Sequence, residues 1–263
     1  MNVFGYSDIG PRRASNQDHF SSATISQPPK LRGVKKREKN ALLAVVCDGM
    51  GGASGGEVAS HLAVNTFMEK MKEESPRDAL GALEDALSAA NAAVYAAAEE
   101  NEALRGMGST MVAALAYGRA LALLNVGDSR IYLWHAGHLL LLTHDHSYVQ
   151  AMVDAGKMSA EEARYSLHKN VITRAVGTRS AVLGDIAYSY WEEGDRLLLC
   201  TDGVSGVLSD ADIAEVLSAD IPIERAAREL VDKAVNLGSE DNLTALLIEN
   251  TKENPECSTQ ASI

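Results

Sequence analysis

The chain alternates between short apolar runs and longer segments with helical periodicity. Short apolar runs bounded by turn residues are typical of buried strands. These runs predict strands at residues 3–9, 18–26, 41–47, 109–117, 121–126, 130–134, 183–190, 196–201 and 243–249. Apolar positions spaced three and four residues apart predict helices at residues 56–73, 78–101, 211–218 and 222–237.

The order of these elements indicates the fold class. Groups of strands and groups of helices follow one another without the strict strand–helix–strand alternation of a parallel sheet. We therefore predict an α+β fold, with two antiparallel sheets packed as a central sandwich and helices on both outer faces. Residues 3–9 and 18–26 predict two strands around a turn at Gly10-Pro11.

One segment differs in composition and hydrophobic pattern from the predicted strands around it. Residues 144–175 contain histidines, polar residues and two short helical stretches, which indicates an inserted flap. We expect its histidines His144, His146 and His168 to be solvated rather than functional. A single domain is predicted for residues 1–249, and the polar residues 250–263 predict a disordered tail.

Composition and charge narrow the possible functions. With 263 residues, 46% of them hydrophobic, the chain can bury a full core without disulfides. Two of its three cysteines lie in apolar runs, which indicates buried thiols in a reducing compartment. The chain shows neither a signal-peptide pattern nor an apolar stretch of roughly 20 residues, so we expect a cytoplasmic protein with no membrane contact. A net charge of -12 disfavours nucleic acid as a partner.

Aspartates beside apolar runs give the strongest chemical signal. Asp48, Asp128, Asp202 and Asp241 each stand next to a predicted strand. Asp-Gly and Gly-Asp pairs are ordinary turn sequences, so any one of them alone is better explained as a turn. Strands that share one core bring such carboxylates together, and like charges in a partly dry site need a counter-charge. Oxygen ligands suit a divalent cation, and we therefore predict a metal-dependent hydrolase.

Sequence spacing excludes several other hydrolytic sites. No cysteine has an arginine six positions later, and the Walker phosphate loop, the HExxH zinc helix and the GxSxG elbow are absent. An oxygen-only ligand set favours Mg²⁺ or Mn²⁺ over Zn²⁺. Two such ions activate water and neutralise a phosphoryl group. A site of this kind also needs an arginine that binds the phosphate through two hydrogen bonds. Arg13 is well placed for this role, and Arg12 is equally suitable in its chemistry.

Five motifs occur in a fixed order along the chain. They are Arg13-x-x-Asn16-Gln17-Asp18, Cys47-Asp48-Gly49-Met50-Gly51-Gly52, Gly127-Asp128-Ser129-Arg130, Thr201-Asp202-Gly203 and Asp241-Asn242. In this order and spacing they resemble the PP2C (PPM) metal-dependent serine/threonine protein phosphatases, and the chain looks like a bacterial member. The flap also matches, at residues 142–147 and 170–177. The resemblance covers residues 2 to about 249.

The resemblance implies a core site for two Mn²⁺ or Mg²⁺ ions. By its motif, Asp48 would bridge the two ions, which share a nucleophilic water or hydroxide. Asp202 and Asp241 would complete the coordination of one ion, and the Gly49 carbonyl would be a ligand of the other. Asp18 would hold water that is bound to the metal.

The resemblance also implies roles around this core. Arg13 matches the arginine that binds the substrate phosphate, and Asn242 would support the Asp241 end of the site. Asp128 remains for a weaker third ion, with the flap residue Ser159 as a candidate partner.

Three positions depart from fuller family patterns. Met50 stands where animal members have a histidine proposed as general acid, Gln17 stands where many members have glutamate, and Gly206 stands where some have an aspartate for a third metal. Bacterial members commonly show some of these changes, so they do not indicate loss of activity.

The implied function is metal-dependent hydrolysis of phosphoserine and phosphothreonine in proteins, reversing a bacterial Ser/Thr kinase. The expected partners are phosphorylated proteins, either the kinase or its substrates, and the expected state is a monomer. One alternative is a catalytically weak pseudophosphatase that acts as a phosphoprotein-binding module. Another is a two-metal hydrolase of phosphodiesters.

Overall fold

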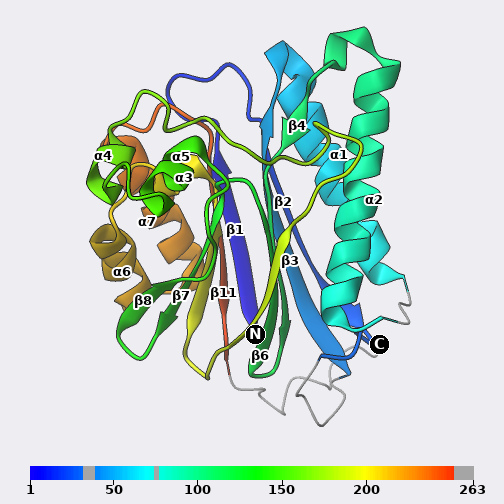
Figure 1. The fold of residues 1–263 in the computed structure, drawn as a ribbon. Coiled ribbons are helices and arrows are strands. Elements are labelled where there is room, and N and C mark those ends of the chain that lie inside the picture. The colour runs from blue at the N-terminus through cyan, green and yellow to red at the C-terminus, as the bar shows by residue number, and fades with distance from the viewer. Residues whose placement is uncertain (32–38, 74–76, 252–263) are drawn as a thin grey trace, which may run out of the picture.

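A computed structural model of the chain describes residues 1–31, 39–73 and 77–251 (Figure 1). Two antiparallel sheets stand face to face at its centre. The first sheet has the order β1-β11-β10-β7-β8, and its strands in that order span Asn2–Asp8, Leu243–Glu249, Arg196–Cys200, Arg130–His135 and His138–Leu141. The second has the order β2-β3-β5-β6-β9, with strands that span Asp18–Ser26, Asn40–Met50, Met111–Tyr117, Ala120–Val126 and Asp185–Tyr190. The short β4, Gly108–Ser109, pairs with the end of β3.

Helices cover the outer face of each sheet (Figure 1). The sheet of β2 and β3 carries α1 and α2, which span Gly52–Lys72 and Ala79–Glu100, followed by the 3-10 helix η1 at Glu102–Leu104. The sheet of β10 and β11 carries α5, α6 and α7, which span Asp202–Ser205, Asp210–Ser218 and Ile223–Asn236. The predicted flap contains α3 and α4, which span Tyr148–Asp154 and Ala160–Arg164.

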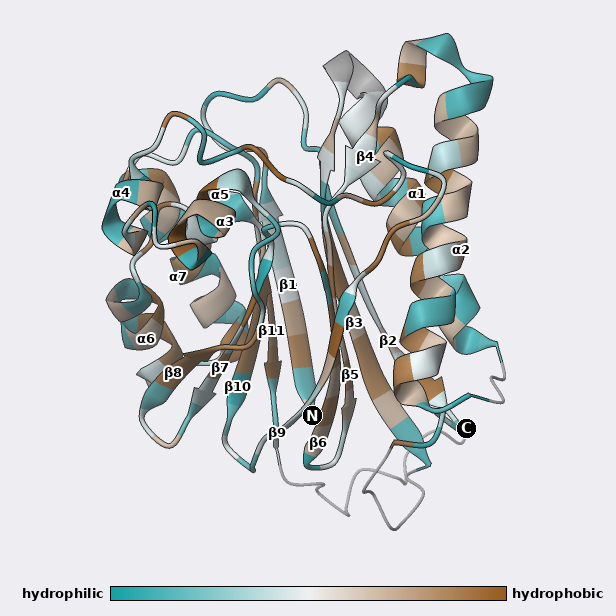
Figure 2. Cartoon of the chain, viewed as in Figure 1, coloured by the Kyte–Doolittle hydropathy of each residue, from teal (hydrophilic) through white to brown (hydrophobic). Residues whose placement is uncertain are grey.

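Alternation along the strands divides the apolar residues between three core layers. In β3, Leu43 and Val45 pack in the layer of α1 and α2, whereas Ala44 and Val46 face the opposite sheet. The same division holds in β10 and β11, whose outer layer contains α6 and α7. Successive side chains of a strand point to opposite faces, so a strand that is buried on both faces forms a continuous apolar run. Figure 2 shows this in the brown inner strands and the teal patches on the helices.

The predicted α+β class, with two antiparallel sheets between helices, is confirmed. The two strands predicted at residues 3–9 and 18–26 are present as β1 and β2, and they lie in different sheets, because β1 pairs with β11 and β2 pairs with β3. The turn at Gly10-Pro11 therefore joins two different sheets. Strand β8 was not predicted, because its short His138–Leu141 sequence lies at a sheet edge and remains largely exposed.

Two expectations about the whole chain can be compared with the described residues. Cys47 and Cys200 are buried free thiols, as their apolar surroundings predicted. No helix in residues 1–31, 39–73 and 77–251 is long and apolar enough to cross a membrane. Most of the predicted tail, residues 252–263, lies outside the described residues, so its disorder stays a prediction.

Candidate active site

Strand pairing and strand ends bring the predicted carboxylates together. Asp18 and Asp48 are direct cross-strand partners at the start of β2 and near the end of β3. Asp202 begins α5 just after β10, and Asp241 lies just before β11. Asp18, Asp202, Asp241 and Asp128 are all close enough for their charges to raise the pKa of the Asp48 carboxyl. The structure therefore gathers five of the sequence-predicted aspartates at one end of the sandwich.

Asp18 lies at the bottom of this cluster and is 5% exposed. Its Oδ2 accepts hydrogen bonds from the hydroxyls of Thr201 at 2.8 Å and Thr244 at 2.7 Å. Its Oδ1 is buried and has no hydrogen-bond partner. Burial raises the pKa of Asp18 to about 7, and the two hydroxyls oppose that rise. Asp18 therefore has one oxygen fixed by the protein and one oxygen free for a ligand.

Asp48 and Asp202 are two further carboxylates of the cluster, each with part of its surface still exposed. Burial raises the pKa of Asp48 well above its ordinary value, and the charges of Asp18 and Asp202 raise it further. The pKa of Asp202 is raised by burial and then by the charge of Asp241. Asp202 Oδ1 is also buried without a hydrogen-bond partner. Carboxylates in this environment resist ionisation until a cation neutralises them.

The backbone beside Asp48 is held in a narrow space. The Asp48 N–H donates to Thr110 Oγ1 at 2.9 Å, and the Thr110 N–H donates back to the Asp48 carbonyl at 2.8 Å. The next residue is Gly49, where an added Cβ would lie 1.9 Å from the Gly56 carbonyl oxygen. Only glycine fits at such a close approach of two backbone segments. The dense glycines after Asp48 therefore allow α1 to begin directly against the carboxylate cluster.

Asn242 joins the N-terminal segment to the end of the site that bears Asp241. Its side-chain Nδ2 donates to the carbonyls of Ile9 at 2.8 Å and Ser15 at 3.0 Å, and its Oδ1 accepts from the Gln17 N–H at 2.9 Å. All three side-chain bonds of Asn242 thus go to the segment that contains Arg13, which fits the expected supporting role.

Arg13 lies beside the carboxylates at the surface of the site. Its Nη2 donates to Asp241 Oδ2 at 2.6 Å, and this hydrogen bond is the main reason why the pKa of Arg13 is raised. The Arg13 side chain remains 47% exposed. Arg12 is only 3.8 Å from Glu240 in a fully exposed pair and makes no contact with the aspartates. The geometry therefore favours Arg13 over Arg12 as the arginine of the site.

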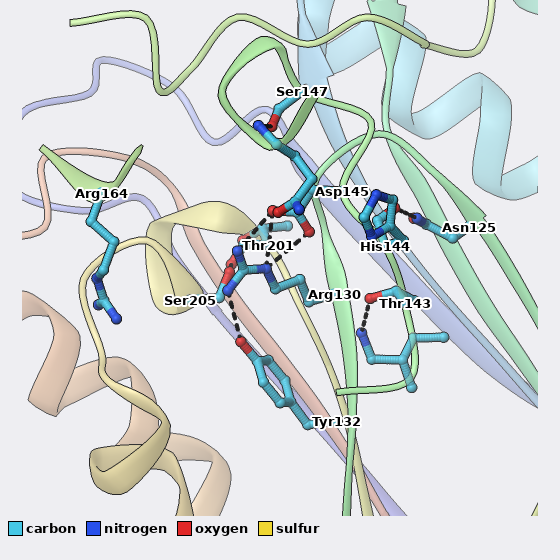
Figure 3. Close-up of polar contacts among 12 residues, drawn as sticks. Asn125, Arg130, Tyr132, Thr143, His144, Asp145, Ser147, Arg164, Thr201 and Ser205 are labelled. Carbon is cyan, nitrogen blue, oxygen red and sulfur yellow. Dashed lines mark hydrogen bonds and ion pairs between the residues drawn. The ribbon is translucent and has the colours of Figure 1, made fainter. Parts of the chain in front are cut away.

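A cleft of about 760 Å³ opens above the cluster, between the flap and α5. Both signs of charge occur on its walls. Its charged lining residues are Arg12, Arg13, Asp128, Arg130, Asp145, Arg164, Lys169, Asp202, Asp210, Glu240 and Asp241. Burial raises the pKa of Asp128 to about 8, against the opposing charge of Arg130. Figure 3 shows Arg130 within this region, between Asp145 and Tyr132.

Two sequence-predicted residues have a different setting from the core aspartates. Ser159 is the N-cap of α4, where its hydroxyl is 2.8 Å from Glu162 Oε2 and completes a capping box. We therefore leave Ser159 out of the metal site. Gly206 donates its N–H to the Asp202 carbonyl at 2.6 Å and closes α5, so it supports the Asp202 turn without adding a ligand.

Some residues of the site were not identified from the sequence. Thr201 directly follows the apolar run of β10, and Thr244 interrupts the apolar run of β11. A polar residue in or beside an apolar run was therefore the available signal. His146 was expected to be solvated, but it is 5% exposed, and that expectation is wrong. Its neighbours in space are Gly127 and Asp185, which no sequence spacing could reveal.

The donor set fits a hard divalent cation in its chemistry, because it consists of carboxylate oxygens, two of them buried without a partner. Within the described ranges, no three carboxylate, imidazole or thiol groups converge closely enough to form a metal cluster as they stand. One reason lies in Asp241, whose Oδ2 is engaged by Arg13. The site is thus a set of oxygen donors that would have to move closer together to hold a cation.

Comparisons with known proteins point to one family of phosphatases. The sequence model of the family described as Protein phosphatase 2C matches residues 14–247. The serine/threonine phosphatase stp of Listeria monocytogenes is 34% identical over 221 residues, which cover 82% of this chain and 88% of stp. The structure of the S. agalactiae serine/threonine phosphatase has a TM-score of 0.84 at 30% identity, covering 94% of this chain and 98% of that chain. The catalytic domain of the phosphatase PstP in complex with 2 manganese ions has a TM-score of 0.78 at 34% identity, covering 94% and 96%.

Proposed function

The chain belongs to the protein phosphatase 2C family of serine/threonine phosphatases, and we propose that it hydrolyses phosphoserine and phosphothreonine in proteins by using divalent cations. The observation that carries this proposal is the group of three carboxylates whose pKa values are raised by burial, Asp18, Asp48 and Asp202, at a cleft that has Arg13 on its wall. Such a group is costly to fold unless cations neutralise it.

The cations we propose are Mn²⁺ or Mg²⁺, held by Asp48, Asp202, Asp241 and the Gly49 carbonyl, with Asp18 behind them. Two observations support this assignment, namely the unpartnered Oδ1 atoms of Asp18 and Asp202 and the raised pKa values of the cluster. When bound, divalent ions lower the pKa of water and offset the negative charge of a phosphoryl group. We propose two ions in this core and a weaker third beside Asp128.

Arg13 holds the substrate phosphate in this proposal. A guanidinium presents parallel N–H groups that match phosphate oxygens, and it stays charged at all relevant pH values. Its present partner, Asp241, is also a proposed cation ligand. Cation binding to Asp241 therefore competes with the Arg13 pair and releases the guanidinium toward the cleft, where a phosphoryl group can take the place of the carboxylate.

The substrate class follows from the shape and charge of the cleft. The cleft is broad and open between the flap and α5, which suits a phosphorylated side chain on a protein segment better than a small buried metabolite. Its walls include the basic residues Arg164 and Lys169 from the flap in addition to Arg13. We therefore propose phosphorylated proteins as partners, including a Ser/Thr kinase or its substrates.

The test is phosphate release from a phosphothreonine peptide, measured with Mn²⁺ and with a chelator. Wild-type protein should release phosphate only with the metal, and Asp48→Asn should lose at least about a hundredfold in rate. Asp85→Asn in α2 is a matched control, because Asp85 also contacts an arginine but lies in an exposed pair. Circular dichroism and thermal unfolding would show that each variant is folded.

Three results would contradict the proposal in different ways. Full activity of Asp48→Asn would show that the metal site is misplaced. A folded wild-type protein that binds the phosphopeptide but releases no phosphate with either metal would support the alternative of a pseudophosphatase. Faster release from an aryl phosphodiester than from the phosphopeptide would indicate a phosphodiesterase.

A further inference from the structure

Two histidine side chains lie against each other where α1 packs on β2. His19 is the second residue of β2, and His61 lies in the first half of α1. Their rings are stacked, with centroids 3.6 Å apart and planes inclined by 22°. Neither residue lines the cleft above the carboxylates. The proposed phosphatase reaction therefore makes no use of this pair.

The strand and the helix bring the two rings to the same solvent-accessible rim. His19 is the cross-strand partner of Cys47, which is buried in the layer beneath α1 and α2. Partners on paired strands point to the same face of a sheet, so His19 also points toward the helices that cover this face (Figure 1). His19 is half-buried and His61 is exposed. The pair therefore lies at the edge of the contact between helix and sheet, where an ion can reach it from solvent.

The ring nitrogens of both histidines lack protein partners. No hydrogen bond or ion pair joins either ring to another residue in the described part of the chain. Other histidines of this protein differ, because His135, His144 and His146 each contact a carboxylate. A neutral imidazole carries one nitrogen lone pair, which accepts a hydrogen bond or binds a metal ion. Two unpaired rings side by side thus offer two nitrogen donors.

The separation of the rings suits one shared ion. Two imidazole nitrogens bound to one Zn²⁺ at about 2.0–2.1 Å lie about 3.3 Å apart at a tetrahedral angle. The ring centroids of His19 and His61 are already 3.6 Å apart. Because stacked rings direct their lone pairs nearly parallel to each other, one ring has to tilt for both nitrogens to meet at the ion. The exposed ring of His61 can make this rotation without a movement of the backbone.

A carboxylate stands one helical turn away from His61. Glu57 precedes His61 by four residues, so both side chains lie on the same face of α1, and zinc helices place two ligands at this spacing. The start of α1 is close to β2, since Gly56 lies against the side chain of Gln17. Glu57 is exposed, and its carboxylate forms no ion pair with any described residue. As the described groups stand, three ligands have not converged, so the Glu57 side chain has to turn toward the rings.

We propose that His19 and His61, together with the Glu57 carboxylate, bind a divalent cation that prefers imidazole, such as Zn²⁺, with water completing its coordination. Imidazole suits Zn²⁺, Ni²⁺ and Cu²⁺, whereas Mg²⁺ and Mn²⁺ prefer carboxylate oxygens and water. This site therefore differs in chemistry from the oxygen ligands around Asp48 and takes a different ion. It goes beyond the proposed function, because it involves neither the substrate phosphate nor the cleft.

A cation at this site has a structural consequence. It ties α1 to β2 next to the point where the Gly49 and Gly56 backbones meet, which is where α1 begins. An ion that binds only the folded protein stabilises that state by mass action. Zn²⁺ should therefore raise the unfolding temperature of wild type more than that of His61→Ala. Binding of Zn²⁺ to the oxygen ligands of the core is common to both proteins, so the difference reports the histidine site.

The first test uses Cu²⁺ as a probe, because coordinated nitrogen nuclei split its electron paramagnetic resonance signal and oxygen ligands do not. With Mg²⁺ in excess, wild type should show two bound nitrogens, and His61→Ala should show at most one. Alanine is the strongest helix former, so His61→Ala keeps α1 intact. His138→Ala is the matched control, because His135 and His138 face each other across the β7–β8 turn. An unchanged spectrum in His61→Ala would overturn the proposal, as would a loss of the nitrogen signals in His138→Ala.

The second test uses wild-type protein, so it does not depend on the folding of a variant. In Mg²⁺, the imidazole C–H resonances of His19 and His61 should shift together along one binding curve as Zn²⁺ is added, and the His138 resonance should not follow them. Glu57→Gln should shift this curve to higher Zn²⁺. Histidine resonances that stay in place would show that the two rings are only stacked. Neither test involves a phosphorylated substrate, so a failure to release phosphate would contradict the proposed function and leave this result unaffected.

Discussion

The cost of burying Asp18 should be measurable as a pH-dependent free energy of unfolding. Burial raises the pKa of Asp18 from 3.8 to about 7 in the folded protein without metal. A raised folded pKa means that stability is fully present below the unfolded pKa and is lost as the pH rises through the folded pKa. The total loss is about 4 kcal/mol, and more than half of it develops between pH 5 and pH 8.

Asp18→Asn removes this loss, because the amide is neutral and its oxygen can still accept from Thr201 and Thr244. In chelator, the free energy of unfolding of the variant relative to wild type should therefore increase by about 2–3 kcal/mol from pH 5 to pH 8. Urea titration followed by tryptophan fluorescence measures it, since Trp191 is fully buried. Saturating Mn²⁺ should stabilise wild type more than the variant. A variant that differs from wild type equally at both pH values would refute the reasoning.

Three further predictions concern the surroundings of the same carboxylates. Arg13→Lys should raise the KM for a phosphothreonine peptide roughly tenfold, because an ammonium cannot grip phosphate with two parallel N–H groups; an unchanged KM would contradict its role. Gly49→Ala should lower the free energy of unfolding by about 2 kcal/mol or more in urea titration, because its Cβ would meet the Gly56 carbonyl at 1.9 Å. Thr244→Val removes a hydrogen bond that favours ionised Asp18, so in chelator the variant should lose about 1.5–3 kcal/mol of stability at pH 8 and much less at pH 5. Equal losses at both pH values would contradict that account.

The sequence predicted those parts of the fold that leave a local periodic signal. Strands buried on both faces form continuous apolar runs, so β3 and β5 were predicted nearly to their ends. The pairing of strands leaves no such local signal, because it depends on residues far apart in the chain. Strands β1 and β2 follow one another in the chain, yet they lie in different sheets, since β1 finds its partner in β11.

The candidate site shows the same division between local and distant information. The order of the motifs identified Asp48, Asp202 and Asp241, because each motif combines a carboxylate with a strand end. The hydroxyls that hold Asp18 were missed, although Thr201 and Thr244 are polar positions in apolar runs. The burial of the flap histidine His146 depends on tertiary contacts, which no spacing in the sequence records.

The pairing of β1 with β11 bears on how the protein is made. Among the described strands, β1 has one neighbour, and that neighbour is the last strand of the chain. Asp241 stands just before β11, and Asn242 anchors the segment that carries Arg13. A chain still on the ribosome therefore has an unpaired first strand and an incomplete site until β11 emerges. Phosphatase activity should therefore appear only after β11 has emerged and paired with β1.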